Sequence, residues 1–253
     1  MANSKTELPA LEPDPFEPRP EEVERYVREV QGLGTDDREL GRRAAWGQIR
    51  LAGMRARGRP DEAFETLNLI FRLGSPPTAP LTGLYDGIMV TPSLWRPADL
   101  ALTALAAAWM PWVGKRFDAE AQSGDNLLTA SARPVARVLW PSYRPWDAPN
   151  DRLGAFRFRT YTGPGTVDPD RETLKIDYDS DQNPGLLIRD ILDELVEVVP
   201  GAYLGKVLLR RGGDDEPRWQ LIGYFGLQPP RTSREPEEAA EAESAAAAAP
   251  ATV

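Results

Sequence analysis

Cysteine and histidine are both missing from the 253 residues of this chain, and these two absences exclude more functions than any motif does. Without cysteine there are no disulfides, thiolate nucleophiles, cysteine–zinc sites or iron–sulfur ligands. Without histidine there is no Ser-His-Asp or Cys-His catalysis, no histidine-ligated haem and hardly any catalytic transition-metal site. Carboxylates alone still permit Mg²⁺ or Ca²⁺, but the acids lack EF-hand spacing. We therefore expect no metal and no cofactor.

A long hydrophobic run is also missing, since no stretch of about 18 apolar residues is present to span a bilayer. The nearest candidate, residues 100–113, is too short and contains Pro111. The amino terminus has neither the basic start nor the apolar core of a signal peptide. A net charge of −9 argues against a nucleic-acid partner, because lysine and arginine supply most of such affinity. We predict a cytoplasmic protein without a membrane span and leave its oligomeric state open.

The composition divides the chain into four parts. Residues 1–20 hold five prolines and few large apolar side chains, which predicts a disordered arm. Residues 21–75 read as a helical N-terminal segment whose clearest helix covers 61–73. Residues 76–230 carry the strand signals, and residues 231–253 form an acidic, low-complexity tail of glutamate and alanine that we expect to be disordered.

The strand signals begin after Pro80, where the hydrophobic period shortens toward two. Turn signals such as Ser-Gly-Asp-Asn at 123–126 separate the stretches. Seven or eight short strands joined by tight turns predict a mainly β fold, an antiparallel sheet curled into a barrel behind the helical segment. The predicted strands are 83–91, 114–122, 127–132, 134–140, 155–162, 172–178, 202–211 and 218–228.

Two helices are expected to interrupt these strands. The first spans about 97–109. The second starts at Asn183-Pro184, a capping residue followed by proline, and would pack across the barrel or plug it. Its apolar face would hold Leu187, Ile188, Ile191, Leu192, Leu195 and Val198. Its acidic face, expected in water, would hold Asp190, Asp193, Glu194 and Glu197.

Lys115 is the most unusual polar residue of the predicted barrel. Alternation places it on the same strand face as Phe117, opposite Arg116. A charged amine on an interior face is costly unless it has a partner or reaches water. In one interpretation Lys115 reaches the rim or pairs with Asp86, Asp177 or Asp179. In the other it meets an anionic or carbonyl group of a ligand at the mouth of a cavity.

Aromatic side chains surround this lysine in the predicted fold. They would either line an apolar pocket or simply fill the barrel. These aromatic residues are Tyr85, Trp112, Phe117, Tyr203, Tyr224 and Phe225. We predict that Lys115 lines or rims a ligand site together with Tyr85, Trp112, Phe117, Tyr203 and Tyr224.

Two motifs resemble a known family. The first, Leu81-Thr-Gly-Leu-Tyr-Asp-Gly87 with Thr91, is followed by Trp112-Val-Gly-Lys-Arg-Phe117. Together they resemble the GXWXG module, although Tyr85 stands where the family name has tryptophan. Residues 176–206 look similar to its companion domain of unknown function, through Ile176-Asp-Tyr-Asp179, Asn183-Pro184, Arg189 and Tyr203-Leu-Gly-Lys206. The resemblance covers about residues 65–228 and implies a lipocalin-like barrel with no established activity.

Three functions remain open at this point. The leading hypothesis is a barrel that binds a small hydrophobic or amphipathic molecule. The second is a histidine-free enzyme with Asp177 or Asp179 as base and a tyrosine or Lys115 polarising a carbonyl. The third is an interaction protein, in which the acidic tail and the arginine-rich stretch between Arg38 and Arg59 recognise other chains.

Overall fold

The computed structural model describes residues 19–33, 37–56, 58–92, 111–185, 187–212 and 218–230. The predicted helix at 97–109 and the predicted acidic tail at 231–253 lie outside these ranges. Nearly all of the predicted disordered arm, residues 1–18, does so too.

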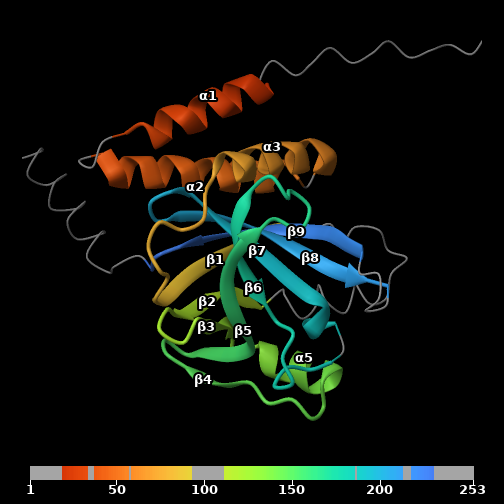
Figure 1. Cartoon of the computed structure of the whole chain (residues 1–253). Helices are drawn as coiled ribbons and strands as arrows, with labels where there is room; N and C mark the ends of the chain where they lie inside the picture. The colour runs from red at the N-terminus through yellow and green to blue at the C-terminus, as the bar shows by residue number, and fades with distance from the viewer. Residues whose placement is uncertain are drawn as a thin grey trace, which may run out of the picture.

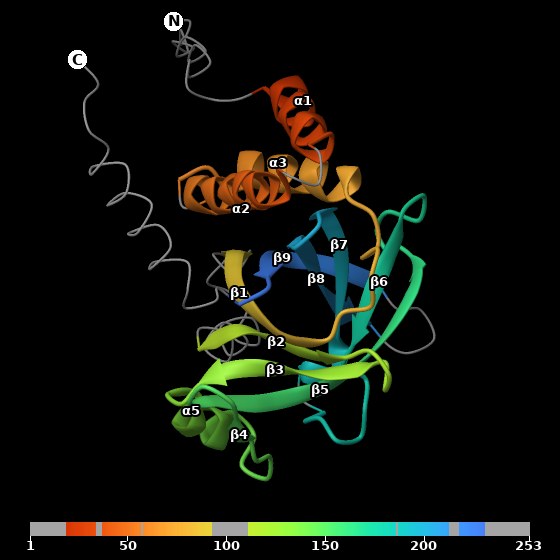
Figure 2. The same cartoon turned by 90° about the vertical axis from the view of Figure 1, so that its left-hand side faces the viewer.

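The described strands form a closed antiparallel β-barrel, as the alternation predicts (Figures 1 and 2). Eight strands run in the order β3-β2-β1-β9-β8-β7-β6-β5, and β3 pairs with β5 to close the ring. The short β4 pairs with β5. The bounds are β1 Gly83–Pro92, β2 Trp112–Asp118, β3 Ser123–Thr129, β4 Trp146–Ala148, β5 Arg152–Pro164, β6 Glu172–Asp177, β7 Ile191–Val199, β8 Ala202–Arg211 and β9 Arg218–Gln228.

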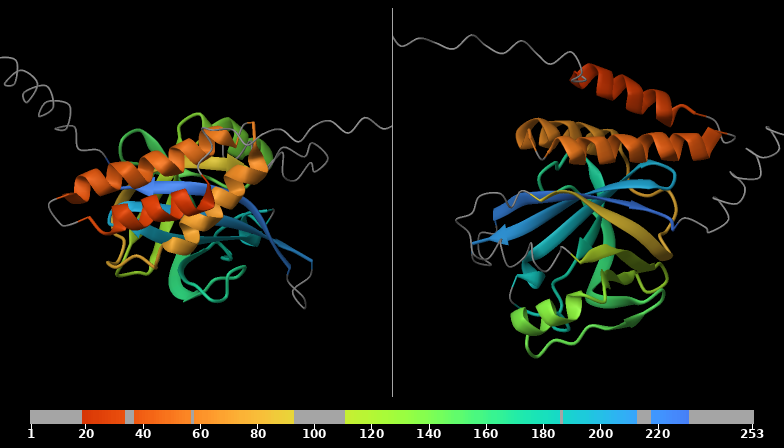
Figure 3. Two further views of the ribbon diagram at one scale, coloured as in Figure 1. Left: turned by 90° about the horizontal axis from the view of Figure 1, so that it is seen from above. Right: turned by 180° about the vertical axis from the view of Figure 1, so that it is seen from behind.

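Three helices precede the barrel and cover one side of it. They are α1 Pro20–Gln31, α2 Arg38–Arg55 and α3 Pro60–Leu73. Seen from above, they lie across the strands at one end of the molecule (Figure 3), while α5, Ala132–Leu139, lies at the opposite end (Figure 1). Proline occupies the first turn of α1 and of α3, where its missing N–H costs nothing. The predicted helical N-terminal segment is therefore present.

Alternation along the strands gives the molecule two hydrophobic cores. The interior core lies inside the barrel and includes Phe117, Phe158 and Phe225. The helix-facing core lies between the outside of the barrel and α1 to α3, and joins Leu67 of α3 to Leu204 of β8. A strand such as β8 therefore serves both cores, so its residues are buried on both faces.

The helix predicted from Asn183 to Val198 is wrong. A short 3₁₀ turn, Ile188–Asp190, leads directly into β7, in which every residue is buried. Apolar residues spaced by three and four are expected in a helix, but a strand buried on both faces can show the same spacing. The spacing therefore could not distinguish the two. The supposed water-facing acids Asp193, Glu194 and Glu197 are buried too.

Two smaller predictions are also wrong. Residues 134–140 were expected as a strand, but 134–139 belong to α5 and Trp140 follows its end. This two-turn helix is too short to show a clear helical period. The expected turn at 123–126 is part of β3, because Asp125 and Asn126 are not exposed turn residues. Asp125 binds Arg116 on the neighbouring strand, with contacts of 2.7 and 2.8 Å, and Asn126 faces the barrel interior.

Candidate ligand site in the barrel interior

Lys115 points into the barrel, as predicted, and only 2% of it is exposed. Its Nζ lies 2.9 Å from Oδ2 of Asp193, which projects inward from β7 on the far side of the interior. Of the two interpretations weighed from the sequence, the ion pair is present, but its partner is not one of the three predicted aspartates. Asp193 was missed because the predicted helix placed it in water.

A hydrogen-bonded network surrounds this ion pair. Lys115 also donates to Oδ1 of Asn126 at 2.9 Å and to the hydroxyl of Tyr178. The Tyr178 hydroxyl donates to Oδ2 of Asp193 at 3.0 Å, and the Nε1 of Trp112 donates to Oδ1 of Asn126 at 3.0 Å. All three hydrogens of the ammonium therefore have acceptors, which a buried charge requires.

Four aromatic rings enclose the ammonium. Their centroids lie between 5.0 and 5.7 Å from Nζ of Lys115, within the range of cation–π attraction. The rings belong to Trp112, Phe158, Tyr178 and Phe225. Both charged members of the network are buried, Lys115 at 2% and Asp193 at 3% exposure.

Glycine makes room for two of these rings. A Cβ on Gly87 would lie 2.3 Å from the indole of Trp112, and a Cβ on Gly205 would lie 2.1 Å from the ring of Phe225. Both distances are far below van der Waals contact, so no other residue fits beneath either ring. Gly114, at φ 148°, lets β2 pass close to the Tyr85 carbonyl. These glycines belong to the motifs found in the sequence.

One atom of the network has no hydrogen-bond partner in the part of the chain that the structure describes. Oδ1 of Asp193 is buried and accepts no hydrogen bond from the described residues, whereas Oδ2 accepts from both Lys115 and Tyr178. A buried acceptor without a donor costs about 1–3 kcal/mol. The interior therefore offers one hydrogen-bond acceptor to a guest, whether water or a ligand.

Burial dominates the protonation of the three ionisable groups. It raises the pKa of Asp193 more than the charge of Lys115 lowers it. It likewise lowers the pKa of Lys115 more than Asp193 raises it. Burial, followed by the nearby Asp193 carboxylate, raises the pKa of Tyr178 well above its usual value. The site thus favours neutral forms and keeps the phenol as a hydrogen-bond donor.

The remaining predicted site residues separate into two places. Tyr85, Phe117 and Tyr203 lie in the interior, where the ring centroid of Tyr85 is 5.5 Å from that of Phe117 and 5.7 Å from that of Tyr203. Burial, followed by the carboxylate of Glu197, raises the pKa of Tyr203. Glu197 also accepts from the backbone N–H and the hydroxyl of Thr78, at 3.0 and 2.7 Å. Glu197 lies four residues beyond Asp193 on β7 and is therefore a second polar group, separate from the network around Lys115.

Tyr224 does not line the interior, which corrects the prediction. It faces the helices, and its ring lies 5.3 Å from that of Phe64 in α3. Consecutive strand residues point to opposite faces, so Tyr224 and Phe225 cannot both point inward. Phe225 is the one that does.

The three predicted aspartates also have other partners. Asp86 binds Arg152 at 2.8 Å and Asp177 binds Arg159 at 2.8 Å, while Asp179 lies 4.0 Å from Arg210. Asp177 and Asp179 therefore cannot serve as bases beside Lys115. The signal that could have found Asp193 was Lys115 itself, because an inward lysine requires an inward carboxylate on another strand.

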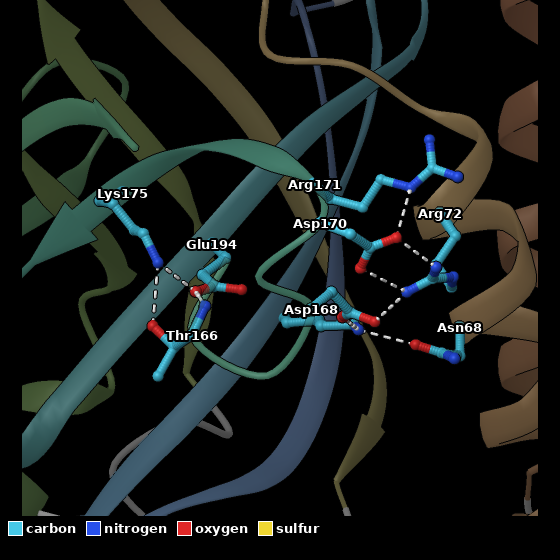
Figure 4. Close-up of polar contacts among 9 residues, drawn as sticks. Asn68, Arg72, Thr166, Asp168, Asp170, Arg171, Lys175 and Glu194 are labelled. Atoms are coloured by element: carbon cyan, nitrogen blue, oxygen red, sulfur yellow. Dashed lines mark hydrogen bonds and ion pairs between the residues drawn. The ribbon is translucent and has the colours of Figure 1, made fainter. Parts of the chain in front are cut away.

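A second buried polar cluster lies on the outside of the barrel (Figure 4). Lys175 of β6, Glu194 of β7 and Lys206 of β8 are register neighbours. Lys175 and Glu194 form an ion pair, and Thr166 donates its N–H to Glu194 at 2.6 Å. The loop that carries Thr166 joins β5 to β6 and lies over this row.

The same loop connects the row to the helices. Its Asp168 binds Lys206, which also donates to Asn68 of α3 at 2.7 Å. Arg72 of α3 binds Asp168 at 2.5 Å and Asp170 at 2.7 Å. We call Thr166, Asp168, Lys175, Glu194 and Lys206, together with Asn68 and Arg72, the outer clamp.

Two kinds of feature are missing from the described residues. No group of three or more acidic residues there is arranged to hold a metal ion. None of the helices in the same ranges is both long and apolar enough to cross a membrane. The cytoplasmic location and the lack of a nucleic-acid partner stay predictions.

Comparison with known proteins gives little further information. No protein-family model matches the chain, and no curated protein matches it. The crystal structure of a protein from Thermomonospora curvata is similar at 18% sequence identity, over 71% of this chain and 99% of that chain, with a TM-score of 0.37.

Proposed function

We propose that the chain binds a small apolar or amphipathic molecule inside the barrel, next to Lys115 and Asp193. The observation that carries the proposal is the buried Oδ1 of Asp193, which lacks a donor among the described residues. Binding sites for small molecules are mostly apolar with a few fixed polar groups, and this interior has that composition. An eight-stranded barrel is also large enough to hold one small ligand.

The network indicates which chemistry the ligand would carry. Oδ1 of Asp193 accepts hydrogen bonds, so the ligand needs a hydroxyl or an N–H at that point. The aromatic rings around Lys115 favour a flat or aliphatic body. We also propose that the chain is a distant relative of the GXWXG module, because Gly87 and Gly114, both part of the resembling motifs, make the close contacts that shape this interior.

Native mass spectrometry of the purified full chain tests the proposal. We expect a small molecule to travel with the wild-type protein and to be lost from Lys115→Met. Lys175→Met is the matched control, because it removes another buried, carboxylate-paired lysine on the outer face. If both variants retain the molecule, the site is wrong. If the wild type carries none and a library of hydroxylated apolar compounds produces no thermal shift, the function is wrong.

A second candidate function is acid–base chemistry on a carbonyl compound. The observation in its favour is the Tyr178 hydroxyl, which lies between Lys115 and Asp193 and stays protonated. Such a phenol can polarise a carbonyl while Asp193 moves a proton at the neighbouring carbon. Loss of α-deuterium from a panel of small ketones, followed by NMR, would detect this activity. It should vanish in Tyr178→Phe, and its absence in the wild type would leave binding as the sole function.

A further inference from the structure

Helix α2 carries an apolar stripe on its outer side, of which Leu40, Gly47, Leu51 and Met54 are exposed, while Ala44 is half-buried against the helix-facing core. Its members recur at intervals of three and four, which places them on one face of a helix. Leu40 and Met54 are 60% and 66% exposed, whereas Trp46 and Ile49 on the opposite face are buried against the barrel. We call this surface the α2 stripe, formed by Leu40, Ala44, Gly47, Leu51 and Met54.

The centre of the stripe is open enough for another helix to come close. Gly47 is exposed, and a Cβ built on it would meet no atom within 4 Å. Small residues allow helix axes to approach, and large residues at either end of the stripe would then pack beside the incoming helix. The stripe rises by about 21 Å from Leu40 to Met54, at about 1.5 Å for each residue.

Positive charge flanks the stripe. Arg43 and Arg50, one helical turn to either side of Gly47, are exposed on the same edge. Arg43 binds Glu39 at 2.7 Å, but two-thirds of its side chain remains open to solvent. The surface therefore suits a helix that is small on one face and acidic along an edge.

The described chain ends beside α2, on the side of the helix that faces the barrel, so residues 231–236 would have to lead round α2 to the stripe. A Cβ placed on Gly201 would lie 3.0 Å from Cδ of Arg42 in α2 and 3.7 Å from Cδ of Pro229. The last described residues after β9 are thus beside the amino-terminal half of α2. Residues 231–253 continue from this point.

The sequence that continues has the matching chemistry. Residues 237–249 contain four glutamates near their start and then five consecutive alanines, between Pro236 and Pro250. Alanine and glutamate are strong helix formers, and proline is well placed just before such a segment and just after it. As a helix the segment would be about 20 Å long, the length of the stripe. The segment has no large apolar residues, so the large apolar side chains of such a contact would come from Leu40, Leu51 and Met54 of α2.

We propose that residues 237–249 dock as a helix along the α2 stripe of the same chain, parallel to α2. The glutamates then lie near Arg43 and Arg50, and the alanines pack over Gly47 toward Met54. A second copy of the chain fits less well, because antiparallel pairing of two stripes would bring Arg43 and Arg50 of each copy together. The contact occupies the surface that an acidic helix from another protein would need.

Distance measurements on the full chain test this docking. Because the chain has no cysteine, Met54→Cys with Ala247→Cys accepts two spin labels at defined places. We expect a short, narrow distance distribution, as for packed helices with axes about 10 Å apart. Val138→Cys with Ala247→Cys is the matched reference, since Val138 of α5 is 79% exposed at the opposite end of the barrel.

Charge reversal provides the second arm. Arg43→Glu with Arg50→Glu should broaden and lengthen the Met54–Ala247 distance, whereas Arg133→Glu with Arg137→Glu on α5 should leave it unchanged. A broad distribution in the unreversed protein, like that of the Val138 reference, would overturn the proposal. A short distance that appears only when two singly labelled proteins are mixed would overturn it in favour of a second copy.

Discussion

Asp193 and Glu194 are consecutive residues of β7, and both are buried and paired with a lysine, yet their surroundings differ. Glu194 faces outward, where Lys175, Thr166 and the row to Lys206 hold it within the outer clamp. Asp193 faces inward, where aromatic rings surround its lysine. The outer pair, Lys175 and Glu194, belongs to a cluster that holds the β5–β6 loop and α3 against the barrel. The inner pair, Lys115 and Asp193, contacts only other side chains of the interior.

This difference indicates how to separate a structural ion pair from a binding site. Burial and charge are similar in both places, so neither property decides. What differs is whether the surrounding chain uses the carboxylate to hold another element. Both carboxylates keep one buried oxygen without a partner among the described residues, Oδ1 of Asp193 and Oε2 of Glu194. Only at the inner site does this oxygen lie between apolar, aromatic walls, and that combination suits a ligand.

The largest effect is expected from Glu194→Ala. It leaves Lys175 buried without its charge partner and releases the N–H of Thr166, so we expect a loss of about 3–5 kcal/mol in the free energy of unfolding. Urea unfolding measures this change. Replacing both partners, by Lys175→Met with Glu194→Leu, should restore most of the stability. A loss below that of a surface mutation would show that the outer clamp does not hold the loop.

A smaller effect is expected from Asp193→Asn. Lys115 keeps Asn126 and Tyr178 as acceptors, and its lowered pKa lets it lose its proton, so we expect a loss of about 1.5–3 kcal/mol. The same unfolding experiment compares the two variants directly. If Asp193→Asn proves the more damaging, the inner pair is the structural one and the contrast between the two faces is reversed.

Acid should affect the two regions in opposite directions. Burial raises the pKa of Asp168, but Lys206 and Arg72 outweigh it and lower the pKa overall. Its contribution is therefore present above the unfolded value of about 3.9 and is lost as the pH falls through the lower folded pKa. The pKa of Asp193 is raised, so its ionised form costs stability, and that cost disappears as the pH falls from the folded pKa toward about 3.9.

Unfolding curves at several acidic pH values check these signs. On acidification, the free energy of unfolding of the wild type should lose its excess over that of Asp168→Asn. Over the same range it should rise relative to that of Asp193→Asn. Parallel curves for both variants would contradict the assigned directions.

The smallest effect is expected from Asp177→Asn. Asp177 binds Arg159 at 2.8 Å on the outer face of β6, but the arginine side chain is 65% exposed. Exposed ion pairs contribute about 0–1 kcal/mol, so the free energy of unfolding should hardly change. The change should be smaller still at high salt, which screens the pair. A loss comparable to that of Glu194→Ala would show that outward position, rather than burial and attachment of the loop, makes a pair structural.

Much of the barrel could be predicted because its strands alternate or end at clear turns. The bounds expected for β8 and β9 agree with the structure, and the inward direction of Lys115 followed from its apolar neighbours. A strand of half-buried type displays its faces in the sequence itself. The fold class and the central lysine were therefore accessible.

The site could be predicted only in part, because its partners come from distant strands. Asp193 looked like the wet side of a helix, since the lysines that neutralise β7 lie elsewhere in the chain. The run Val196-Glu-Val-Val199, rich in β-branched residues, was a local signal for a strand. Tyr178 and Phe158 could not be placed beside Lys115 without the register of the strands.

The opposite faces of Asp193 and Glu194 have a consequence for how the barrel assembles. If β7 slipped by one residue against its neighbours, each carboxylate would move to the other face. A slip in one direction would put Leu192 in the place of Asp193 beside Lys115, and a slip in the other would put Leu195 in the place of Glu194 beside Lys175. Either slip would therefore leave one buried lysine without its partner. Hydrophobic residues lie on both faces of β7, so hydrophobic packing alone would tolerate such a slip. The two adjacent carboxylates therefore select one register of β7 against its neighbours.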